Sequence, residues 1–574
     1  MSFRDSTLLG VCQGRSVDSK RCLTNGFIGL VGHDQEYDFG IRSVKPDAVD
    51  FAFLKQRLDH CRSNHKGWCF PSKANQITGL RVIDCISEDR RVIPAPPGCQ
   101  YAALSYVWGS LPEAPMKAYS RVVNDAIEAT RSLGLQYLWV DKHCIDQHNN
   151  THKQNQISQM DAIYMNSEVT LIDAEGDNST HGLAGVGRSR IHQRQETVDG
   201  VTLLQGFPLI AVRVRESPWA TRGWTLQEGY LSPRRVMFTN HGASYLCNTS
   251  HCAEWEAQPL LAGDWKSTKV FEGLIPQAGY KTANLRVSPF SAISLMKEYS
   301  RRQLSFVSDM TNACLGMLNF LQTSQLYAPW GIIVQKSLSP KGGWDIGLAW
   351  YHEHPVKRNP DNPSWSSLGW QSSANFSLPS RGWWRWRVLD SYIHFGDSRA
   401  QQFNVSTLMD ELKNRRMAIS YIEWTREQKL HTTIVTRDPP WQQSWYENPQ
   451  HSGYYASLRV GDNAHMMLNC CLDAELLTTD AWVIGLILLS YTEQELILKG
   501  IVPDRVFEYD ARVLLLRSHG AFYERIGYLE VPHYGATPRA FHNNAGERLD
   551  EIRMDSINTM FSIEKESIQT IVIG

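Results

Sequence analysis

The sequence lacks both an excess of charge and a long hydrophobic run. Its 574 residues include 58 Lys and Arg against 59 Asp and Glu, so the net charge is −1. Nucleic-acid-binding proteins usually present a basic face, and this composition does not predict one. The longest apolar run, residues 481–489, falls well short of the roughly 20 residues of a membrane-spanning helix. Nucleic acid and membrane are therefore excluded from the expected partners.

The N-terminus also lacks the apolar core of a secretory signal, because Met1-Ser2-Phe3-Arg4-Asp5 leads into a mixed stretch. We therefore expect a cytoplasmic protein whose 12 cysteines are thiols rather than a disulfide framework. A hydrophobic content of 42% with 20% charged residues is typical of a globular protein. The length exceeds one ordinary core and predicts two or three domains.

One group of cysteines has a spacing that metal ligands use. Cys61, His65 and Cys69 recur every four residues just after a predicted amphipathic helix, although a glycine between the last two interrupts a continuous helix. Zinc needs a fourth ligand, and the nearest candidates, Cys85 and Cys99, lie in other segments. Buried thiols near a helix end are the simpler interpretation, so no metal is assigned.

The pattern of the chain changes twice along its length. Residues 1–97 hold an irregular arm rich in Gly and Ser, followed by a helix at 48–62 with Asp47 as its N-cap. Residues 98–255 alternate short apolar strands with helices, which predicts βαβ units and a parallel sheet. Residues 256–574 predict a mixed α+β region with antiparallel sheet.

Individual elements follow from the same periodicities. The expected strands are 102–107, 137–140 and 169–173 in the parallel sheet, and 483–489, 511–517 and 521–531 in the C-terminal region. The expected helices are 119–132, 153–165, one starting near residue 218, 292–301 and 308–321. In an open α/β sheet, ligands bind beyond the carboxyl ends of the strands, so residues there are the first candidates for a site.

Three motif blocks carry most of the functional signal. The first two, Tyr101–Gly109 (YAALSYVWG) and Leu138–Gln147 (LWVDKHCIDQ), run from an apolar strand into polar, chemically capable residues. The third, Trp219–Glu228 (WATRGWTLQE), predicts a helical turn. It sets the indole of Trp224 four residues before the carboxylate of Glu228, so both project from one helix face.

In this order the blocks resemble the fungal heterokaryon-incompatibility (HET) domain, whose patterns are Y-x-A-L-S-Y-x-W-G, L-W-[IV]-D-x-x-C-I-x-Q and W-x-x-R-x-W-T-x-Q-E. Residues 156–164 match a helix of the form Q-x-x-x-M-x-x-I-Y that follows the second block. The chain departs from the family at Lys142 and His143, where small or apolar residues are usual. The resemblance implies a fungal protein.

HET domains are in turn similar to TIR domains, and this likeness implies a TIR- or flavodoxin-like parallel sheet flanked by helices. Enzymatic TIR domains cleave NAD at the nicotinamide–ribose bond with a glutamate in a W-C-x-x-E helix motif. Trp224-Thr225-Leu226-Gln227-Glu228 has the same spacing, with Thr in place of Cys. The analogy, which operates at the level of the fold, points to Glu228.

The expected catalytic residues are Glu228, Asp141 and His143. A carboxylate such as Glu228 can orient a ribose hydroxyl and favour an oxocarbenium-like sugar, with the structural alternative that it pairs with an arginine. Asp141 either binds ribose hydroxyls or caps the turn that follows it, and His143 could supply acid–base chemistry. The expected substrate-binding residues, each of which could equally be a packing residue, are Ser105, Tyr106, Trp108, Gly109, Cys144, Arg222 and Trp224.

Three functions stay open at this point. The first is a TIR-like enzyme that cleaves NAD or a related nucleotide in incompatibility or cell-death signalling. The second is a biosynthetic enzyme for secondary metabolites, with His, Asp and Glu as acid–base groups, and the third is a non-catalytic interaction module. No cofactor is expected, since NAD would be a substrate. The expected partners are a small-molecule or nucleotide ligand and a second copy of the chain.

Overall fold

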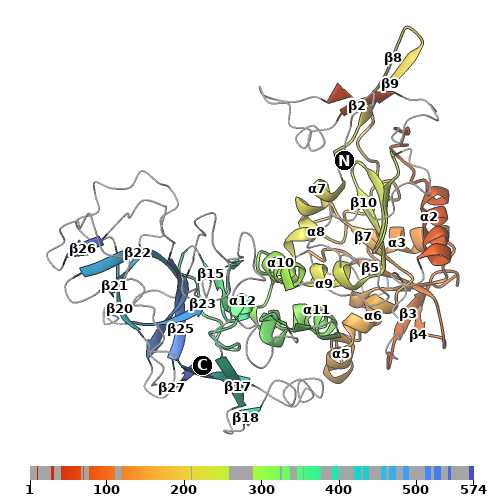
Figure 1. The fold of residues 1–574 in the computed structure, drawn as a ribbon. Coiled ribbons are helices and arrows are strands. Elements are labelled where there is room, and N and C mark those ends of the chain that lie inside the picture. Colours follow the sequence, from red (N-terminus) through yellow and green to blue (C-terminus); the bar gives the residue numbers. More distant parts are fainter. Residues whose placement is uncertain are drawn as a thin grey trace. The chain divides into compact units, whose positions relative to one another are not determined.

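The structure is a computed structural model with two compact units, residues 1–320 and 321–574 (Figure 1). It describes residues 41–65, 69, 77–109, 119–208, 210–256, 289–323, 326–335, 345–352 and 354–376, together with short strands before residue 41 and after residue 390. Among these residues no helix is both long and apolar enough to cross a membrane.

An eight-stranded sheet forms the centre of the first unit, in the order β12-β11-β10-β7-β5-β6-β3-β4. The four middle strands are parallel, and antiparallel strands extend both edges. The bounds are β3 (Arg81–Asp84), β4 (Val92–Pro94), β5 (Tyr101–Ser105), β6 (Tyr137–Trp139), β7 (Val169–Asp173), β10 (Arg234–Thr239), β11 (Gly242–Cys247) and β12 (His251–Ala253). The predicted parallel sheet is confirmed.

The middle strands are covered on both faces, as parallel sheets require. Every residue of β5 and β7 is buried, and helices α3 (Arg121–Ser132) and α9 (Gly223–Leu231) both contact β5 (Figure 1). Helix α6 (Met160–Asn166) packs against α9. The hydroxyl of Tyr101 on β5 donates to the carbonyl of Ile163 on α6, so the odd-numbered residues of β5 face α6 and α9.

The first long helix, α2 (Phe51–Asn64), begins later than predicted. Asp50 is its N-cap, because its side chain accepts from the amide of Phe53, so the prediction of Asp47 was wrong. The residues before Asp50 bond to distant parts of the unit: the amide of Val49 donates to the carbonyl of Gly185, and Arg190 donates to the carbonyl of Ala48. These tertiary contacts explain why the helix begins at Phe51 and not at residue 48.

Two of the predicted helices are each divided. The helix expected at 153–165 becomes α5 (Asn150–Ile157) and α6, and the one expected near residue 218 becomes α8 (Pro218–Thr221) and α9. At the first break the side chain of Gln159 bonds to Thr78, in the segment leading into β3. At the second, Arg222 adopts extended backbone and forms an isolated bridge with Gln303. Each break thus coincides with a contact to a distant segment, through the side chain at Gln159 and through the backbone at Arg222.

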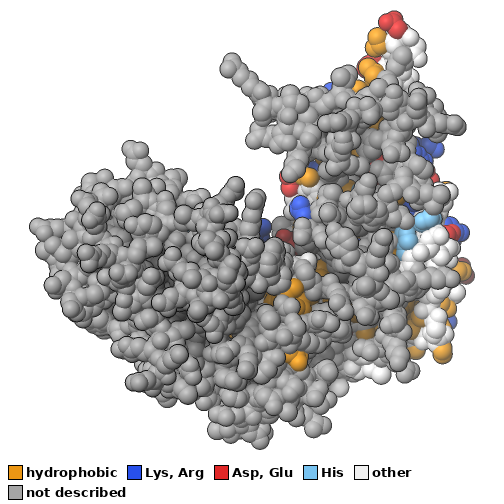
Figure 2. All heavy atoms as spheres, viewed as in Figure 1, with side chains coloured by type: hydrophobic (Ala, Val, Ile, Leu, Met, Phe, Trp, Pro, Cys, Tyr) orange, Lys and Arg blue, Asp and Glu red, His pale blue; other side chains and the backbone are white. Residues whose placement is uncertain are grey.

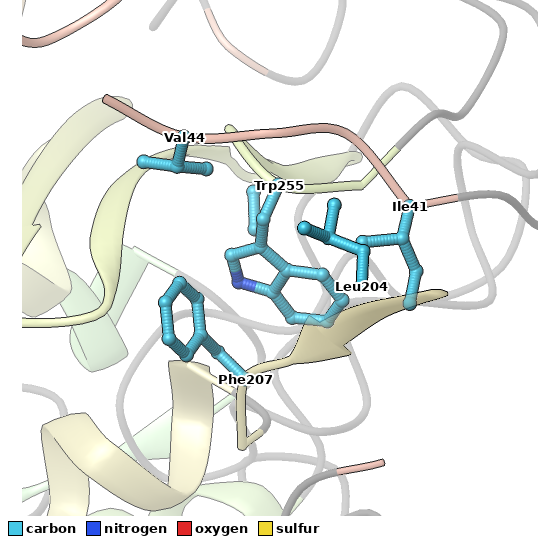
Figure 3. Packing of buried hydrophobic residues seen from close by; sticks show 6 residues of the cluster. Ile41, Val44, Leu204, Phe207 and Trp255 are labelled. Carbon is cyan, nitrogen blue, oxygen red and sulfur yellow. The ribbon is translucent and has the colours of Figure 1, made fainter. Parts of the chain in front are cut away.

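The N-terminal arm was predicted to be irregular, but two short strands within it join an antiparallel sheet of order β1-β2-β9-β8. The β8–β9 hairpin forms one side of this sheet, and Figure 2 shows hydrophobic and acidic side chains at its outer end. A small hydrophobic core also joins residues that are far apart in the sequence (Figure 3). It includes Ile41, Val44, Leu204, Phe207 and Trp255. The bounds are β1 (Leu9–Gly10), β2 (Phe27–Leu30), β8 (Gln195–Val198) and β9 (Val201–Gly206).

The second unit contains an eleven-stranded, mainly antiparallel sheet, as predicted, with one parallel pair between β25 and β27.

The predicted helices at 292–301 and 308–321 appear as α10 (Pro289–Ser300) and α11 (Asn312–Thr323), close to the unit boundary. The strands are β17 (Ser391–Asp397), β18 (Gln402–Phe403), β19 (Ile419–Glu427), β20 (His431–Arg437), β21 (Tyr454–Val460), β22 (Ala464–Leu472), β23 (Val483–Leu489), β24 (Ala511–Ser518), β25 (Tyr523–Val531), β26 (Phe541–Asn543) and β27 (Ile568–Ile573). The domain boundaries after residues 97 and 255 stay predictions.

Candidate functional site

The three motif blocks meet at the carboxyl edge of the parallel strands. Ser105 is the last residue of β5, Asp141 begins a short helix just after β6, and Glu228 lies on α9. The Ser105 hydroxyl donates to the Glu228 carboxylate at 2.5 Å, and the Trp108 indole donates to the Asp141 carboxylate at 3.2 Å. Four of the predicted site residues are thus brought together in pairs.

A chain of hydrogen bonds fixes the orientation of Glu228. The indole N–H of Trp219 on α8 donates to the Ser105 oxygen at 2.7 Å, so the Ser105 proton is directed to Glu228. All three side chains are buried. Glu228 is therefore the final acceptor of this chain of hydrogen bonds, and it accepts the hydrogen bond from Ser105. Trp219 belongs to the third motif block, but the sequence spacing points to Trp224 and gives no signal that Trp219 is a site residue.

The two carboxyl groups have different raised pKa values. Burial raises the pKa of Glu228 to about 8, the nearby charge of Asp141 adds to this, and hydrogen bonds from Ser105 and Tyr164 oppose it. Burial likewise raises the pKa of Asp141 to about 6, against hydrogen bonds from the Lys142 amide and Trp108. At pH 7 the two groups together therefore carry about one negative charge.

A buried hydroxyl lies close to this pair of carboxyls. Tyr106 is 5% exposed, and within the described part of the chain its hydroxyl has no hydrogen-bond partner. Burial raises the pKa of the Tyr106 phenol, and the charges of Asp141 and Glu228 raise it further, which places the ring within electrostatic reach of both. Buried polar groups are rarely left without a partner, so this hydroxyl is a donor available to a ligand.

Three cationic or aromatic residues lie around the pair. The positive charge of Arg222 lowers the pKa of both Asp141 and Glu228, and its side chain is half-buried. The ammonium of Lys142 lies 5.6 Å from the centre of the half-buried Trp108 ring. Lys142, one of the departures from the family pattern, is itself half-buried and lies beside Trp108.

Two other predicted residues have their side chains engaged elsewhere. The indole of Trp224 is half-buried and donates at 3.4 Å to Asp309, in the 3-10 turn Val307–Asp309, rather than to a site residue. The Cys144 sulfur accepts from the amide of Val140, and burial raises the pKa of its thiol to about 12. A thiol so hard to ionise is a poor nucleophile.

Gly109 and His143 occupy the margins of the site. Gly109 has a φ of +77°, and a Cβ on it would lie 2.4 Å from the Cβ of Asn178, so the space beside this glycine is filled by protein. The half-buried ring of His143 packs edge-on against Tyr119 with 4.9 Å between ring centres. Both residues follow the carboxyl end of a strand, as predicted, but their described contacts are with protein.

A family model described as heterokaryon incompatibility protein (HET) matches residues 101–228. The chain contains a HET domain. The match begins at the first residue of β5 and ends at Glu228, so it includes every member of the site. No curated protein and no solved structure gave a significant match to the chain.

Proposed function

We propose that the HET domain cleaves the N-ribosyl bond of NAD or a related nucleotide, as part of fungal incompatibility or cell-death signalling. The observation that carries this proposal is the buried Trp219–Ser105–Glu228 hydrogen-bond chain next to a second carboxylate, Asp141. Enzymes that break glycosidic bonds usually use two carboxyl groups whose pKa values differ.

The strand order supports the same reading. Numbered along the chain, the four parallel strands β5, β6, β7 and β10 lie in the spatial order 2-1-3-4, which begins the flavodoxin-like order. In that order the ligand-binding crevice lies at the switch point between the first and third strands, here β5 and β7. Ser105 is the last residue of β5, next to this switch point.

The chemistry follows from the charges. Nicotinamide leaves from NAD as a neutral molecule, because it carries its positive charge while bound, so the leaving group needs little acid catalysis. The approaching cation lowers the pKa of Glu228, whose ionised carboxylate then accepts a hydrogen bond from a ribose hydroxyl. Together with Asp141 it stabilises the oxocarbenium-like sugar, and water adds to the anomeric carbon while one carboxylate takes its proton. Tyr106 and Trp108 offer a donor and a flat aromatic surface to the nucleotide.

Incubation of the full-length protein with NAD tests this proposal through release of free nicotinamide. Glu228→Gln should lower the rate about a hundredfold or more, because it removes one electrostatic contact to the transition state, while NAD binding changes little. Glu256→Gln is the matched control. Glu256 is also buried at 5% exposure, with its pKa raised by burial to about 7, but it accepts from the amide of Ala253 and belongs to no part of the site.

Each outcome of this assay has a definite meaning. Turnover that survives in Glu228→Gln would keep the reaction but remove Glu228 from it, and Asp141 and His143 would be substituted next. Intact NAD with wild-type protein, even at concentrations that favour self-association, would overturn the proposal. Ligand screening against the same site would then distinguish the two remaining hypotheses, a biosynthetic enzyme and a non-catalytic module.

A further inference from the structure

Outside the HET site, three cysteines and one histidine converge in the first unit. Cys61 lies on α2, His65 is the residue that ends this helix, Cys69 follows four residues later, and Cys247 is the last residue of β11. One potential ligand atom from each of the four lies within 4.8 Å of all the others. The fourth member is therefore Cys247, and neither Cys85 nor Cys99 belongs to the group.

The group has the composition of a zinc site and is close to one in size. Sulfur lies about 2.3 Å and imidazole nitrogen about 2.0 Å from zinc, so the corners of a tetrahedral site are separated by about 3.8 Å or less. The Nδ1 atom of His65 lies 3.5 Å from the sulfur of Cys247, already at such a separation. All four residues are buried, Cys61 and Cys247 completely. A closed site without an open position is the mark of a structural ion.

The surroundings match those of a ligated thiolate. The amide of Ser250 donates to the Cys247 sulfur at 3.3 Å, and the Ser250 hydroxyl lies 3.2 Å from the same sulfur. Arg234 lies directly opposite Cys247 in the β10–β11 pair, where its guanidinium is near Cys61 and also pairs with Glu168 at 3.2 Å. Three thiolates around a divalent ion leave one net negative charge, which a neighbouring guanidinium balances.

We propose that Cys61, His65, Cys69 and Cys247 bind one zinc ion that fastens the end of α2 to the edge of the central sheet. Cys69 and Cys247 are far apart in the sequence, so the ion closes a long loop and stabilises the folded chain over the unfolded one. The bound ion would also stabilise the pairing of β10 with β11. These two strands follow helix α9, which carries Glu228.

The test is the metal content of the full-length protein, purified under reducing conditions and measured by elemental analysis. Wild-type protein should carry about one zinc per chain, as expected of a closed four-ligand site. Cys247→Ser should lose it, whereas Cys85→Ser should keep it. Cys85 is the matched control because it is buried to the same extent but lies outside the group. His65→Cys should also keep the ion, since it replaces one zinc ligand with another.

Cobalt reports the site independently of any variant. Exchange of the ion for Co²⁺ in wild-type protein should give the visible bands of tetrahedral cobalt together with thiolate charge-transfer absorption, and added zinc should abolish both. This measurement decides the matter if Cys247→Ser is insoluble. A strong chelator should lower the melting temperature of wild-type protein but not that of a zinc-free variant.

Three results would overturn the proposal. One is wild-type protein that contains no zinc and takes up no cobalt after reduction. Another is Cys247→Ser that retains as much zinc as Cys85→Ser, which would mean adventitious binding elsewhere. The third is a disulfide between two of the three cysteines, detected as two missing thiols in denatured protein that has not been reduced.

Discussion

Four carboxyl groups of the first unit, three of them buried and Asp141 half-buried, share a raised pKa, and loss of solvent contact is the main cause in each. The values are about 6 for Asp141, about 7 for Asp173 and Glu256, and about 8 for Glu228. Unfolded carboxyl groups titrate near pH 4, so between these limits the folded protein binds protons that the unfolded chain has released. The resulting stabilisation is complete below about pH 4 and is lost as the pH rises through the folded values.

We expect the free energy of unfolding to fall between pH 5 and pH 8, and to fall less steeply in Glu228→Gln. One such group changes the slope by at most about 1.4 kcal/mol per pH unit. Urea unfolding at several pH values measures this slope. Glu216→Gln is the control, because it removes a largely exposed carboxylate that pairs with Arg213, and it should keep the wild-type slope. Parallel curves for wild type and Glu228→Gln would contradict the raised pKa of Glu228.

Several residues of the site could be identified from sequence because local pattern and position agreed. Ser105 and Asp141 follow strands, and Glu228 lies on a helix in a spaced motif, so the topology of an α/β sheet brings them to one edge. Trp219 and Cys247 were missed for a physical reason. Their roles depend on contacts with residues more than 100 positions away, and no local periodicity reports such contacts.

At the scale of elements, the turn after β5 depends on a glycine. Gly109 has positive φ and lies against Asn178, whose loop also donates from Ser179 to the carbonyl of Trp108. Any side chain at position 109 must therefore adopt a strained backbone and displace this loop. Gly98 offers a comparison, since its φ is +69° but nothing lies within 4 Å of an added Cβ.

Gly109→Ala should therefore destabilise the protein more than Gly98→Ala. The strained backbone alone costs about 1 kcal/mol, and this is all that Gly98→Ala should lose. Gly109→Ala adds a steric overlap and should lose about 2 kcal/mol or more. Denaturant unfolding of both variants measures the difference. Equal losses would mean that the Asn178 loop moves aside freely, and the turn would then not be a fixed support for Trp108.

Element boundaries were harder to predict than the elements themselves. The strands at 169–173 and 483–489 were predicted to the residue, because their apolar runs are bounded by polar or turn residues. The start of α2 and the breaks at Gln159 and Arg222 were not, since each coincides with contacts to a distant segment. Helix propensity continues through these positions, and tertiary contacts override it.

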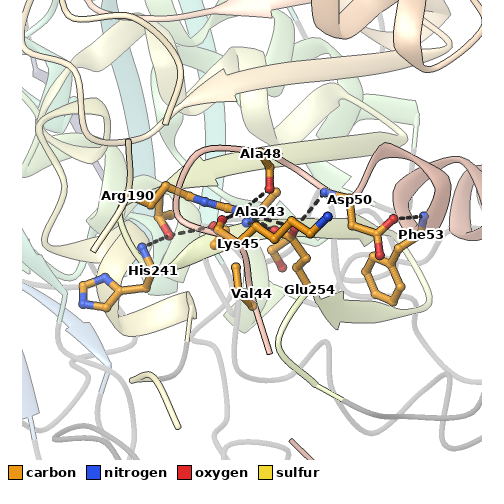
Figure 4. Close-up of polar contacts among 12 residues, drawn as sticks. Val44, Lys45, Ala48, Asp50, Phe53, Arg190, His241, Ala243 and Glu254 are labelled. Carbon is orange, nitrogen blue, oxygen red and sulfur yellow. Dashed lines mark hydrogen bonds and ion pairs between the residues drawn. The ribbon is translucent and has the colours of Figure 1, made fainter. Parts of the chain in front are cut away.

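At the scale of the whole first unit, one buried ion pair joins three distant segments. Arg190 and Glu254 lie 2.6 Å apart with side chains 1% and 4% exposed. Arg190 donates to the carbonyl of Ala48, and Glu254 accepts from the amides of Asp50 and Ala243 (Figure 4). The pair thus fastens the entry of α2 to β11 and to the loop before β8. The sequence gives no signal for it, because its members are 64 positions apart.

The losses caused by removing the two members one at a time should therefore not be additive. Arg190→Met leaves the Glu254 charge buried without its partner and should destabilise the protein by about 3–5 kcal/mol, as should Glu254→Leu. The double variant should lose less than the sum of the two, since neither charge remains. The exposed pair of Arg213 and Glu216, 3.1 Å apart, is the control and should give a coupling energy below about 1 kcal/mol. A double-mutant cycle by urea unfolding gives both energies. If the coupling of Arg190 with Glu254 is no larger than that of the control pair, the backbone contacts rather than the ion pair hold the three segments together.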